Sequence, residues 1–266
     1  MKTRGARSFI TATLLSLACA AASACMAREL FASRDEGGAF MLIAVKTGEP
    51  SSAVPRTMEV IARRCEDMGA RCKVERQGGE QSNRIKVSIS GASDITRFRS
   101  VLLQEGKLEL RPAVSKPNPS PLQTYPTREA AQEEAGALYD VVPYEEHNEP
   151  AAFLVVERRP VVAGSDLRSA DAAPDYDGKR YMITFTLRPE GAATFGDWTE
   201  RNTGRYLAVV LNGRARSAPY IRGRITDSGQ INGDYTKEQA EDLALVLRSG
   251  SLPAPVEVVE AGTYKP

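Results

Sequence analysis

The sequence has 266 residues, of which 42% are hydrophobic and 26% are charged. This composition is sufficient for an ordinary buried core in one or two domains and argues against wholesale disorder. Lysine and arginine total 35 against 34 acidic residues, so the chain lacks the dense basic surface that nucleic-acid phosphates require, and no nucleic-acid partner is expected.

The first 25 residues have the layout of a secretory signal. Lys2, Arg4 and Arg7 form a basic start, and the range 8–24 is uncharged and rich in alanine. Because this apolar run is short and only weakly hydrophobic, a permanent membrane span is the poorer interpretation. We therefore expect an exported protein of the periplasm or cell envelope, with residues 1–25 as its signal.

Two endings of this signal stay open. Ala22-Ser23-Ala24 fits a small-residue cleavage site, and the same residues followed by Cys25 resemble a bacterial lipobox. Cys25 is therefore a candidate for lipid attachment, which would hold the protein at a membrane surface. Ala22 departs from the leucine that is usual at that position, so simple cleavage and secretion is the alternative.

Cys65 and Cys72 are candidates for a disulfide, since an even pair in an oxidising compartment is usually bonded. Gly69 between them is expected to end a helix, so that the chain turns back and brings the two Cα atoms within range. Free buried thiols are the alternative. His147 is the sole histidine and lies far away in sequence, so we expect neither a metal site nor a cofactor.

After a tether at 26–37, strand and helix patterns alternate up to residue 113. Their order is β-α-β-β-α-β, which predicts a ferredoxin-like base at 38–113, with two helices on one face of an antiparallel sheet. The expected elements are strands at 39–45, 72–77, 84–90 and 107–113, a helix from Pro55 to Gly69, and a helix at 95–102.

The rest of the chain predicts a second, mixed α/β subdomain, so the fold class is α+β. Residues 114–150 are a proline-rich connector with a helix, 151–252 form the inserted head subdomain, and 253–266 are a return strand and tail. Within the head, Asn212-Gly213 predicts a hairpin turn, because a type I′ turn requires positive φ at both central residues. The range 231–234 predicts a second turn.

Two helices of the head have clear end signals. Pro189 opens the first, where its missing amide does no harm, and Gly204 follows its end. Thr236 and Gln239 form a capping box at the start of the second, and Gly250 follows its last turn.

Two long segments carry a resemblance to a known family. PEGAATFGDWTERNTGRYLAVVLNGRARSAPYI and GQINGDYTKEQAEDLALVLRSGSLPAPVEVVEA are similar to the head region of SecD, of the SecD/SecF protein-export family. RTMEVIARRCEDMGA, RIKVSISG and GKLELRPA resemble its base, so the resemblance covers about residues 38–260. It implies an extracytoplasmic base that carries a head, in a protein that helps exported chains leave the translocation channel.

This resemblance implies a non-catalytic module that binds exported or unfolded polypeptide, or an envelope or translocon membrane protein. The family continues into membrane helices that couple export to proton flow, and without such helices we expect no proton coupling. A structural or assembly role in the envelope is the alternative, since one fold hosts many functions. The sequence does not locate a binding groove, and Tyr220, Ile221 and Tyr235 are expected to be core residues instead.

An enzyme is not expected. His147 lies in an acidic loop with no nucleophile motif beside it, and neither a glycine-rich phosphate loop nor metal-ligand spacing is present in the sequence. The neighbouring carboxylates of the chain are expected to form a solvated surface.

Overall fold

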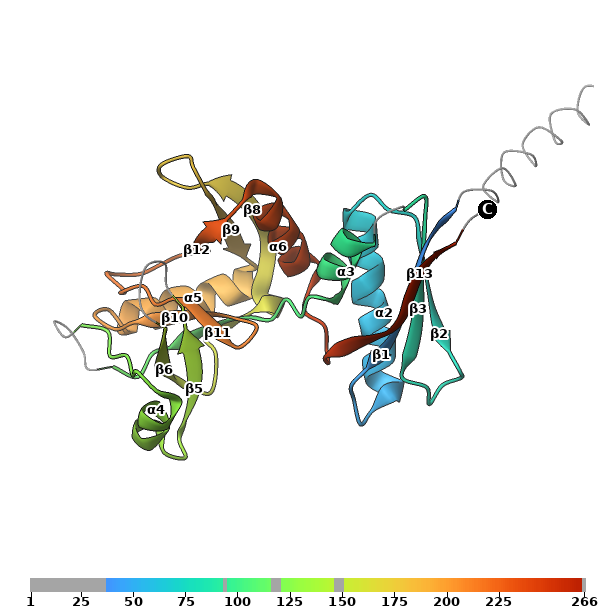
Figure 1. The fold of residues 1–266 in the computed structure, drawn as a ribbon. Coiled ribbons are helices and arrows are strands. Elements are labelled where there is room, and N and C mark those ends of the chain that lie inside the picture. The colour runs from blue at the N-terminus through green and yellow to red at the C-terminus, as the bar shows by residue number, and fades with distance from the viewer. Residues whose placement is uncertain (1–36, 93–94, 116–120, 146–150, 265–266) are drawn as a thin grey trace, which may run out of the picture.

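The computed structural model describes residues 37–92, 95–115, 121–145 and 151–264. They form two units that lie side by side (Figure 1), each with helices packed on sheets. The small unit has a four-stranded sheet, and the large unit has a six-stranded and a three-stranded sheet. The predicted mixture of helices with several sheets is confirmed.

The small unit contains both ends of the described chain. Its sheet has the order β13-β1-β3-β2, with every neighbouring pair antiparallel. Both helices lie on the face turned towards the large unit (Figure 1). Its elements are β1 (Gly38–Val45), α2 (Pro50–Asp67), β2 (Cys72–Gln77), β3 (Arg84–Ser90), α3 (Thr96–Leu103) and β13 (Val256–Tyr264).

Sequence pattern predicted α2 well at one end and poorly at the other. The helix begins at Pro50, five residues before the predicted start, and continues through Pro55. It ends where expected, because Gly69 takes a positive φ of 67° and reverses the chain. Its apolar side chains, among them Val54 and Ile61, pack on Met41, Ile43 and the other inward residues of the sheet.

The fourth strand of this sheet is not the one that the sequence predicted. β4 (Leu108–Pro112) lies in the large unit, where it bonds to β10 (Leu207–Leu211) and β7 (Val162–Ala163). The small sheet is completed by β13, which pairs along the whole of β1 from Gly38↔Tyr264 to Val45↔Val256. Both segments alternate apolar and polar residues, so pattern alone does not tell which one pairs with β1.

This correction moves the boundaries of the units. The chain leaves the small unit after α3, near Gln104, and returns at about Leu252, so the predicted base at 38–113 is too long. The range 114–150 is also more than a connector, because β5 (Tyr139–Tyr144) bonds to two strands of the large unit and α4 (Arg128–Ala135) packs beside it. The sequence analysis missed β5.

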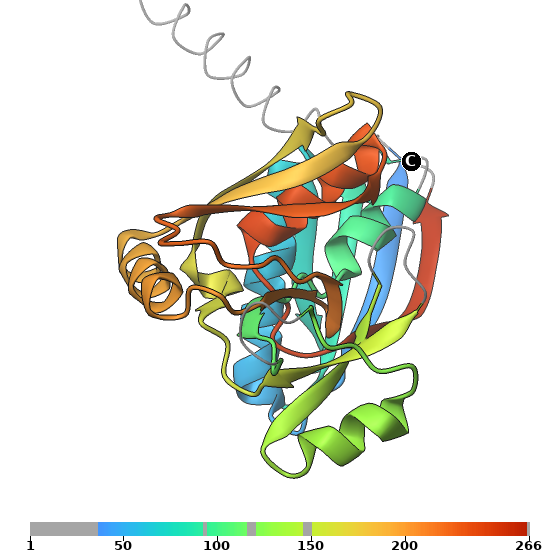
Figure 2. The same cartoon turned by 90° about the vertical axis from the view of Figure 1, so that its left-hand side faces the viewer.

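The large unit is drawn nearest the viewer in Figure 2. Its six-stranded sheet has the order β6-β5-β11-β10-β4-β7, and its three-stranded sheet the order β12-β9-β8. The elements not yet named are β6 (Ala152–Glu157), η1 (Gly164–Asp166), β8 (Leu167–Pro174), β9 (Tyr181–Leu187), α5 (Pro189–Arg201), β11 (Arg214–Ser217), β12 (Ser228–Tyr235) and α6 (Lys237–Ser249).

Local signals in the large unit predicted its turns and helix ends. Asn212 and Gly213 have φ angles of 50° and 76° between β10 and β11, as the type I′ turn requires. Thr236 and Gln239 form the predicted capping box of α6, with N···O distances of 3.2 and 2.9 Å. The predicted turn at 231–234 is instead an irregularity within β12, between Ile231 and Tyr235.

Helix α6 connects the two units. Its apolar side chains, including Leu243 and Leu247, belong to the core of the large unit, while Leu245 and Val246 pack against Val101 of α3. Asp242 also accepts a hydrogen bond from Arg97 of α3 at 2.8 Å. The helix is therefore part of both cores.

A buried arginine binds both segments through which the chain passes between the two units. Arg64 of α2 is fully buried and donates to the carbonyl oxygens of Val101, Leu102 and Gln104 at the end of α3, and to Gly250 after α6. Carbonyls at the ends of helices carry partial negative charge, so they stabilise this cation without a carboxylate. Burial lowers the pKa of Arg64 to about 10, well below the usual value of a guanidinium.

Candidate functional site

Two adjoining cavities lie along one side of the large unit, and together we call them the β11–β12 groove. The first, of about 670 Å³, lies between β9, β12 and the segment 217–219, which begins with the last residue of β11. The second, of about 600 Å³, continues to α3 and α6 at the junction of the units. Ser217 and Asn232 line both cavities, so the two hollows form one continuous feature.

Edges of two different sheets line this groove. Among the residues that the structure describes, β12 is an edge strand of the three-stranded sheet and bonds only to β9. Within the same residues, β11 bonds to β10 on one side and meets β5 on the other at the single pair Ala215↔Tyr144. Strand edges offer peptide N–H and C=O groups to an added strand, so each wall of the groove could accept extended polypeptide.

The register of β12 identifies which peptide groups point into the groove. The amide of Leu187 donates to the carbonyl of Asp227 at 2.7 Å, in line with the pairing Ser228↔Thr186. Hydrogen bonds of an antiparallel pair fall on alternate residues, so Gly229 bonds towards β9 while Ser228 and Gln230 point away from it. The backbone of Gln230 therefore lies at the free edge.

A glycine keeps the floor of this groove closed. A Cβ atom at Gly229 would lie 2.4 Å from Cζ of Phe185, so only glycine admits the ring beneath the strand. Phe185 is almost fully buried and packs in the core of the large unit. The result is an apolar floor under an edge whose own groups are polar.

The charged side chains at the junction end of the groove are paired. Glu145 contacts Arg214 and Arg216, while Asp242 contacts Arg97. Arg216 contacts Glu145 through its Nη1, at 3.3 Å, whereas its buried Nε has no hydrogen-bond partner among the described residues. The local charge is thus largely neutralised, which suits an uncharged peptide backbone better than an ion.

Tyr235 lies at the same end of the groove. Burial raises the pKa of the Tyr235 hydroxyl, and the nearby charge of Arg216 opposes this rise. The ring also packs against the core of the large unit and covers Gly233, where a Cβ atom would lie 2.4 Å from Cε2 of the ring. Tyr235 is therefore both a core residue, as predicted, and part of the groove wall.

The other aromatic and apolar candidates have simpler environments. Ile221 is buried in the core of the large unit, as predicted. Tyr220 is half-buried against Tyr206, with ring centroids 5.3 Å apart in an edge-to-face arrangement. Neither residue lines the two cavities.

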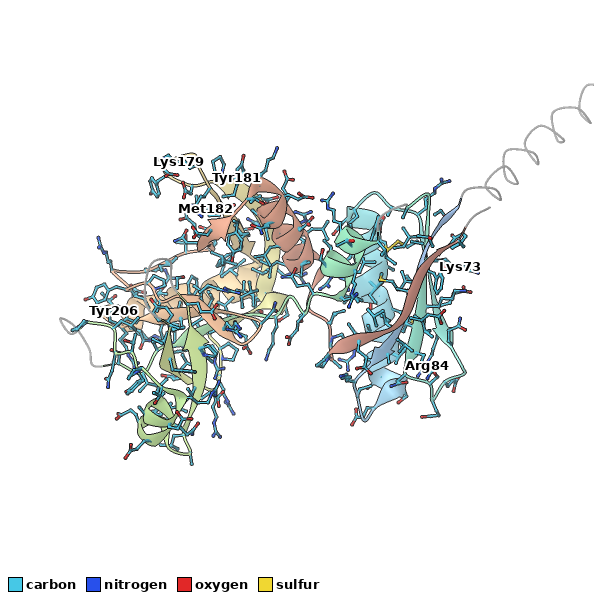
Figure 3. All side chains as sticks on the ribbon, viewed as in Figure 1. Lys73, Arg84, Lys179, Tyr181, Met182 and Tyr206 are labelled. Carbon is cyan, nitrogen blue, oxygen red and sulfur yellow. A yellow bond between two sulfur atoms is a disulfide. The ribbon has the colours of Figure 1, made fainter. Side chains whose placement is uncertain are left out.

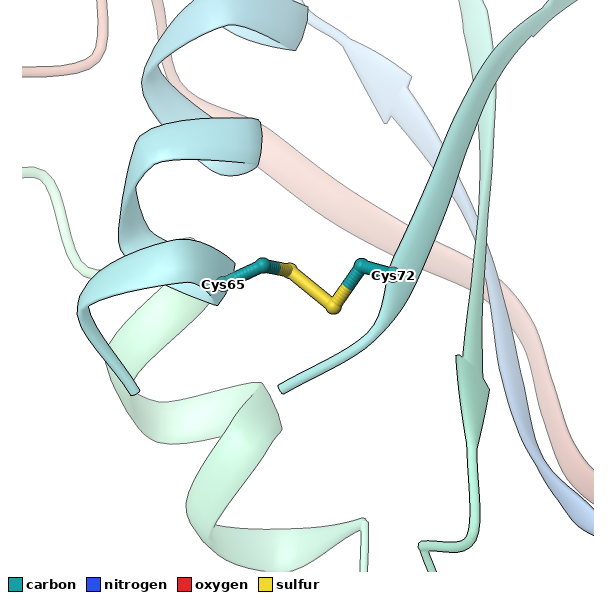
Figure 4. The surroundings of a disulfide bond; sticks show 2 residues. All are labelled: Cys65 and Cys72. Atoms are coloured by element: carbon teal, nitrogen blue, oxygen red, sulfur yellow. A yellow bond between two sulfur atoms is a disulfide. The ribbon is translucent and has the colours of Figure 1, made fainter. Parts of the chain in front are cut away.

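The predicted cysteine pair lies in the small unit, far from the groove in the fold. Cys65 at the end of α2 is joined to Cys72 at the start of β2, with Cα atoms 6.0 Å apart (Figure 4). Cys65 is buried in the core of this unit. The lipid-attachment candidate Cys25 and the sole histidine, His147, lie outside the described residues.

Neither a cluster of metal ligands nor a membrane-spanning helix is found among the described residues. Across the ranges that the structure describes, no three histidine, cysteine or carboxylate side chains are grouped as metal ligands. Within the same ranges, no helix combines the length and the apolar character needed to cross a bilayer.

The residues that line the groove were not predicted from the sequence. Ser217, Gln230 and Asn232 are ordinary polar residues of strands, and their meeting depends on which sheet edges the fold turns towards each other. The register irregularity in β12 has a sequence signal in Asn232-Gly233, but that signal predicts a turn rather than a site.

Comparison with known proteins gives a consistent result. The family model described as SecDF, P1 head subdomain, matches residues 139–254, which run from β5 to just before β13. The protein translocase subunit SecD of Aquifex aeolicus is 32% identical over 207 residues, covering 78% of this chain and 38% of that protein. SecD of Desulfurispirillum indicum is 38% identical over 224 residues, covering 80% and 41%.

Solved structures agree. The crystal structure of SecDF in a super-membrane-facing form has a TM-score of 0.66 at 29% identity, over 86% of this chain and 30% of that one. A structure reported for SecDF as a membrane component that enhances protein export has a TM-score of 0.62 at 29% identity, over 83% and 98%. The chain spans about two fifths of the length of the curated relatives it matches.

Proposed function

Because the chain belongs to the SecD family, in the region called P1, we propose that it is a non-catalytic extracytoplasmic module that assists protein export by binding exported polypeptide. In this proposal the small unit is the ferredoxin-like base and the large unit is the head. The family supports a role in protein export, and the β11–β12 groove supports the binding of extended chain.

One observation carries the binding proposal, namely that two incompletely paired sheet edges line one groove. An unfolded polypeptide offers unpaired backbone groups, and a strand laid along β12 would bond to the outward peptide groups of Ser228 and Gln230. Backbone pairing is nearly independent of sequence, so such a site accepts many exported chains. The paired charges at the junction end impose no strong preference for a charged segment.

A proline substitution tests this edge directly. Gln230→Pro removes the amide that points into the groove, while the ladder between β12 and β9 keeps its bonds at Gly229 and Ile231. Loss of one backbone hydrogen bond should weaken binding of a reduced, alkylated polypeptide by about fivefold to tenfold. The matched control is Gln230→Ala, which keeps the amide and should bind as the parent protein does.

Crosslinking gives a second readout in cells. A photoreactive p-benzoylphenylalanine at Gln230 should form adducts with newly exported chains, whereas the same group at exposed Ala193 of α5 should not. Circular dichroism of each variant would verify the fold. Equal binding by the proline and alanine variants, or equal adducts from both positions, would contradict a polypeptide site in the groove.

The location of the protein is part of the same proposal. We place it in the periplasm or cell envelope, with residues 1–25 as a signal and Cys25 as the candidate point of lipid attachment. The intact mass of the protein isolated from its native membrane would test this. A diacylglyceryl mass on Cys25 supports the anchor, and an unmodified mature terminus supports simple cleavage.

A structural or assembly role is the second candidate, with an envelope or translocon membrane protein as the partner. One specific observation favours it. β1 carries apolar side chains on both faces of its sheet, and α2 and α3 cover only one of them.

A further inference from the structure

The face of the small sheet that points away from the large unit has an apolar centre. Ala39, Met41, Ile43 and Val45 of β1 are fully buried under the helices, so Phe40, Leu42 and Ala44 point to the other face, where each is half-buried. A strand that is apolar on both faces is typical of a sheet that is covered on both faces. We call Phe40, Leu42 and Ala44 the open-face stripe.

Of the two strands beside β1, β3 alternates regularly, whereas β13 has a register irregularity opposite Leu42 and Ile43 that leaves Val259 47% exposed. In β3 the inward residues are apolar, and the outward residues Arg84, Lys86 and Ser88 are polar. An apolar row therefore runs down the middle of a face whose sides are polar, which is the usual anatomy of an interface core and rim.

Charges of opposite sign flank the stripe on its two sides, and one of the carboxylates, Glu257, also contacts Lys46 of its own chain at 2.7 Å. On the β13 side, Glu260 lies beside Leu42 and Glu257 beside Ala44. On the β3 side, Lys86 lies beside Leu42 and Arg84 beside Ala44. The levels of Leu42 and Ala44 thus each have a carboxylate on one side and a cation on the other, whereas Phe40 lies between Gly262 and Ser88.

The more distant strand β2 adds no net charge to this pattern. Lys73 and Glu75 point to the same face and contact each other at 3.0 Å. Figure 3 shows Lys73 and Arg84 on the side of the small unit that faces away from the large unit. Nothing among the described residues of the large unit lies over this side (Figure 1).

We propose that this face binds a second copy of the chain, through a two-fold axis that runs along β1. Such an axis places β13 of one copy over β3 of the other and keeps the levels aligned. Glu260 then faces the copy's Lys86, Glu257 faces the copy's Arg84, and the two open-face stripes meet in the centre. An axis across the strands would instead place acidic β13 over acidic β13.

The ends of the strands agree with this axis. Gly38 of β1 and Tyr264 of β13 are paired at one end of the sheet. A two-fold axis along β1 puts Gly38 and Tyr264 of both copies at the same end of the dimer. This arrangement is compatible with a dimer whose two copies approach one surface with the same end.

Charge reversal tests the pairing because each reversal has a built-in rescue. Lys86→Glu would set glutamate against Glu260 twice in the dimer, and Glu260→Lys would set lysine against Lys86 twice. Sedimentation equilibrium of the full chain should show self-association of the parent protein, weakened by about tenfold in either single variant. An equimolar mixture of the two single variants should associate as the parent does, and so should the double variant.

Two controls separate this interface from a general charge effect. Lys73→Glu reverses a charge on the same face, but β2 lies outside the overlap, so its dissociation constant should stay within about twofold of the parent value. Leu42→Asp, in the centre of the stripe, should give a monomer with parent-like circular dichroism. If Leu42→Asp fails to fold, the charge-reversal mixture still decides the question.

Several outcomes would overturn the proposal. A parent protein that stays monomeric up to its solubility limit would do so, because the face would then have no affinity for its copy. Self-association that neither single reversal weakens, or that the mixture of both variants fails to restore, would assign the dimer to another surface.

Discussion

Replacing Arg64 by methionine should lower the free energy of unfolding more than any surface substitution, because Arg64 bonds to both segments that connect the two units. The change removes the donors to four carbonyl oxygens, those of Val101, Leu102, Gln104 and Gly250. Nη1 has two hydrogens for three of these oxygens, so the contacts amount to about three full hydrogen bonds. Hydrogen bonds from a charged donor contribute about 1.5–3 kcal/mol each, so about 4.5–9 kcal/mol of interaction is lost. The methionine side chain keeps most of the apolar packing of the arginine stem.

Part of this loss is offset because the buried cation is itself unfavourable. The lowered pKa of Arg64, about 10, corresponds to about 3 kcal/mol of desolvation cost. Since the folded pKa lies below the unfolded one, this cost is fully present below pH 10 and is relieved only as the pH rises above the folded pKa. Water entering the site would satisfy some carbonyls, so we expect a net loss of about 3–5 kcal/mol at pH 7.

Urea unfolding followed by circular dichroism measures this loss. The matched control is Arg63→Met on the same helix, because the side chain of Arg63 is 52% exposed and forms an ion pair at 3.5 Å with Glu59 of its own helix, which is also exposed. This control should change stability by less than about 0.5 kcal/mol. Hydrogen exchange adds a local readout, since the amide of Leu252, which donates to Glu105, should lose protection in the Arg64 variant. A loss below about 1 kcal/mol in Arg64→Met would refute the reasoning.

Two further predictions concern the disulfide and the groove floor. Replacing Cys65 and Cys72 by serine should lower stability by about 2–3 kcal/mol, from the loop-closure entropy of a short loop, measured as a lower urea midpoint that reductant no longer changes. Gly229→Ala should cost about 1–3 kcal/mol because its Cβ would overlap the ring of Phe185, whereas Gly48→Ala, in open space, should stay within about 0.5 kcal/mol; equal thermal midpoints for the two alanine variants would refute this packing.

Sequence pattern predicted features whose causes are local. The turn at Asn212-Gly213, the capping box at Thr236 and the reversal at Gly69 each depend on a few neighbouring residues, and the structure shows all three. Backbone conformation at such positions is restricted by the residue itself, so tertiary context rarely overrides it.

Partner choice between strands was not predictable in the same way. β4 and β13 have similar alternating patterns. The sequence analysis assigned β4, which comes first along the chain, as the fourth strand of the small sheet. Pairing of β13 with β1 joins residues more than 200 positions apart, and nothing in the local sequence of either strand specifies it. The burial of Leu108 and Leu110 in the large unit distinguishes β4, but that burial is a property of the assembled fold.

The candidate site has the same limitation for a physical reason. Its functional groups are the backbone edges of β11 and β12, and every residue type except proline presents the same edge groups. The pattern of apolar and polar residues indicates where strands are. An unpaired strand edge forms a binding site only when a second element of the fold lies opposite it and makes a groove. Chemistry-bearing side chains leave a signature in sequence, whereas a backbone site leaves almost none.

The Arg64 contacts at the junction of the two units lie next to the β11–β12 groove. Gln104 lines the junction end of the groove, and its carbonyl oxygen is one of the four that Arg64 binds. The groove wall on that side comes from α3 of the small unit, while Asn212 and Asp242 on the other side come from the large unit. The width of this cavity therefore depends on the angle between the two units. The guanidinium of Arg64 restricts this angle, because it binds the carbonyls of Gln104 and Gly250, where the chain passes from one unit to the other. A polypeptide bound at the junction end touches both units, so its affinity depends on the hydrogen bonds from Arg64 to Gln104 and Gly250, where the chain passes between them.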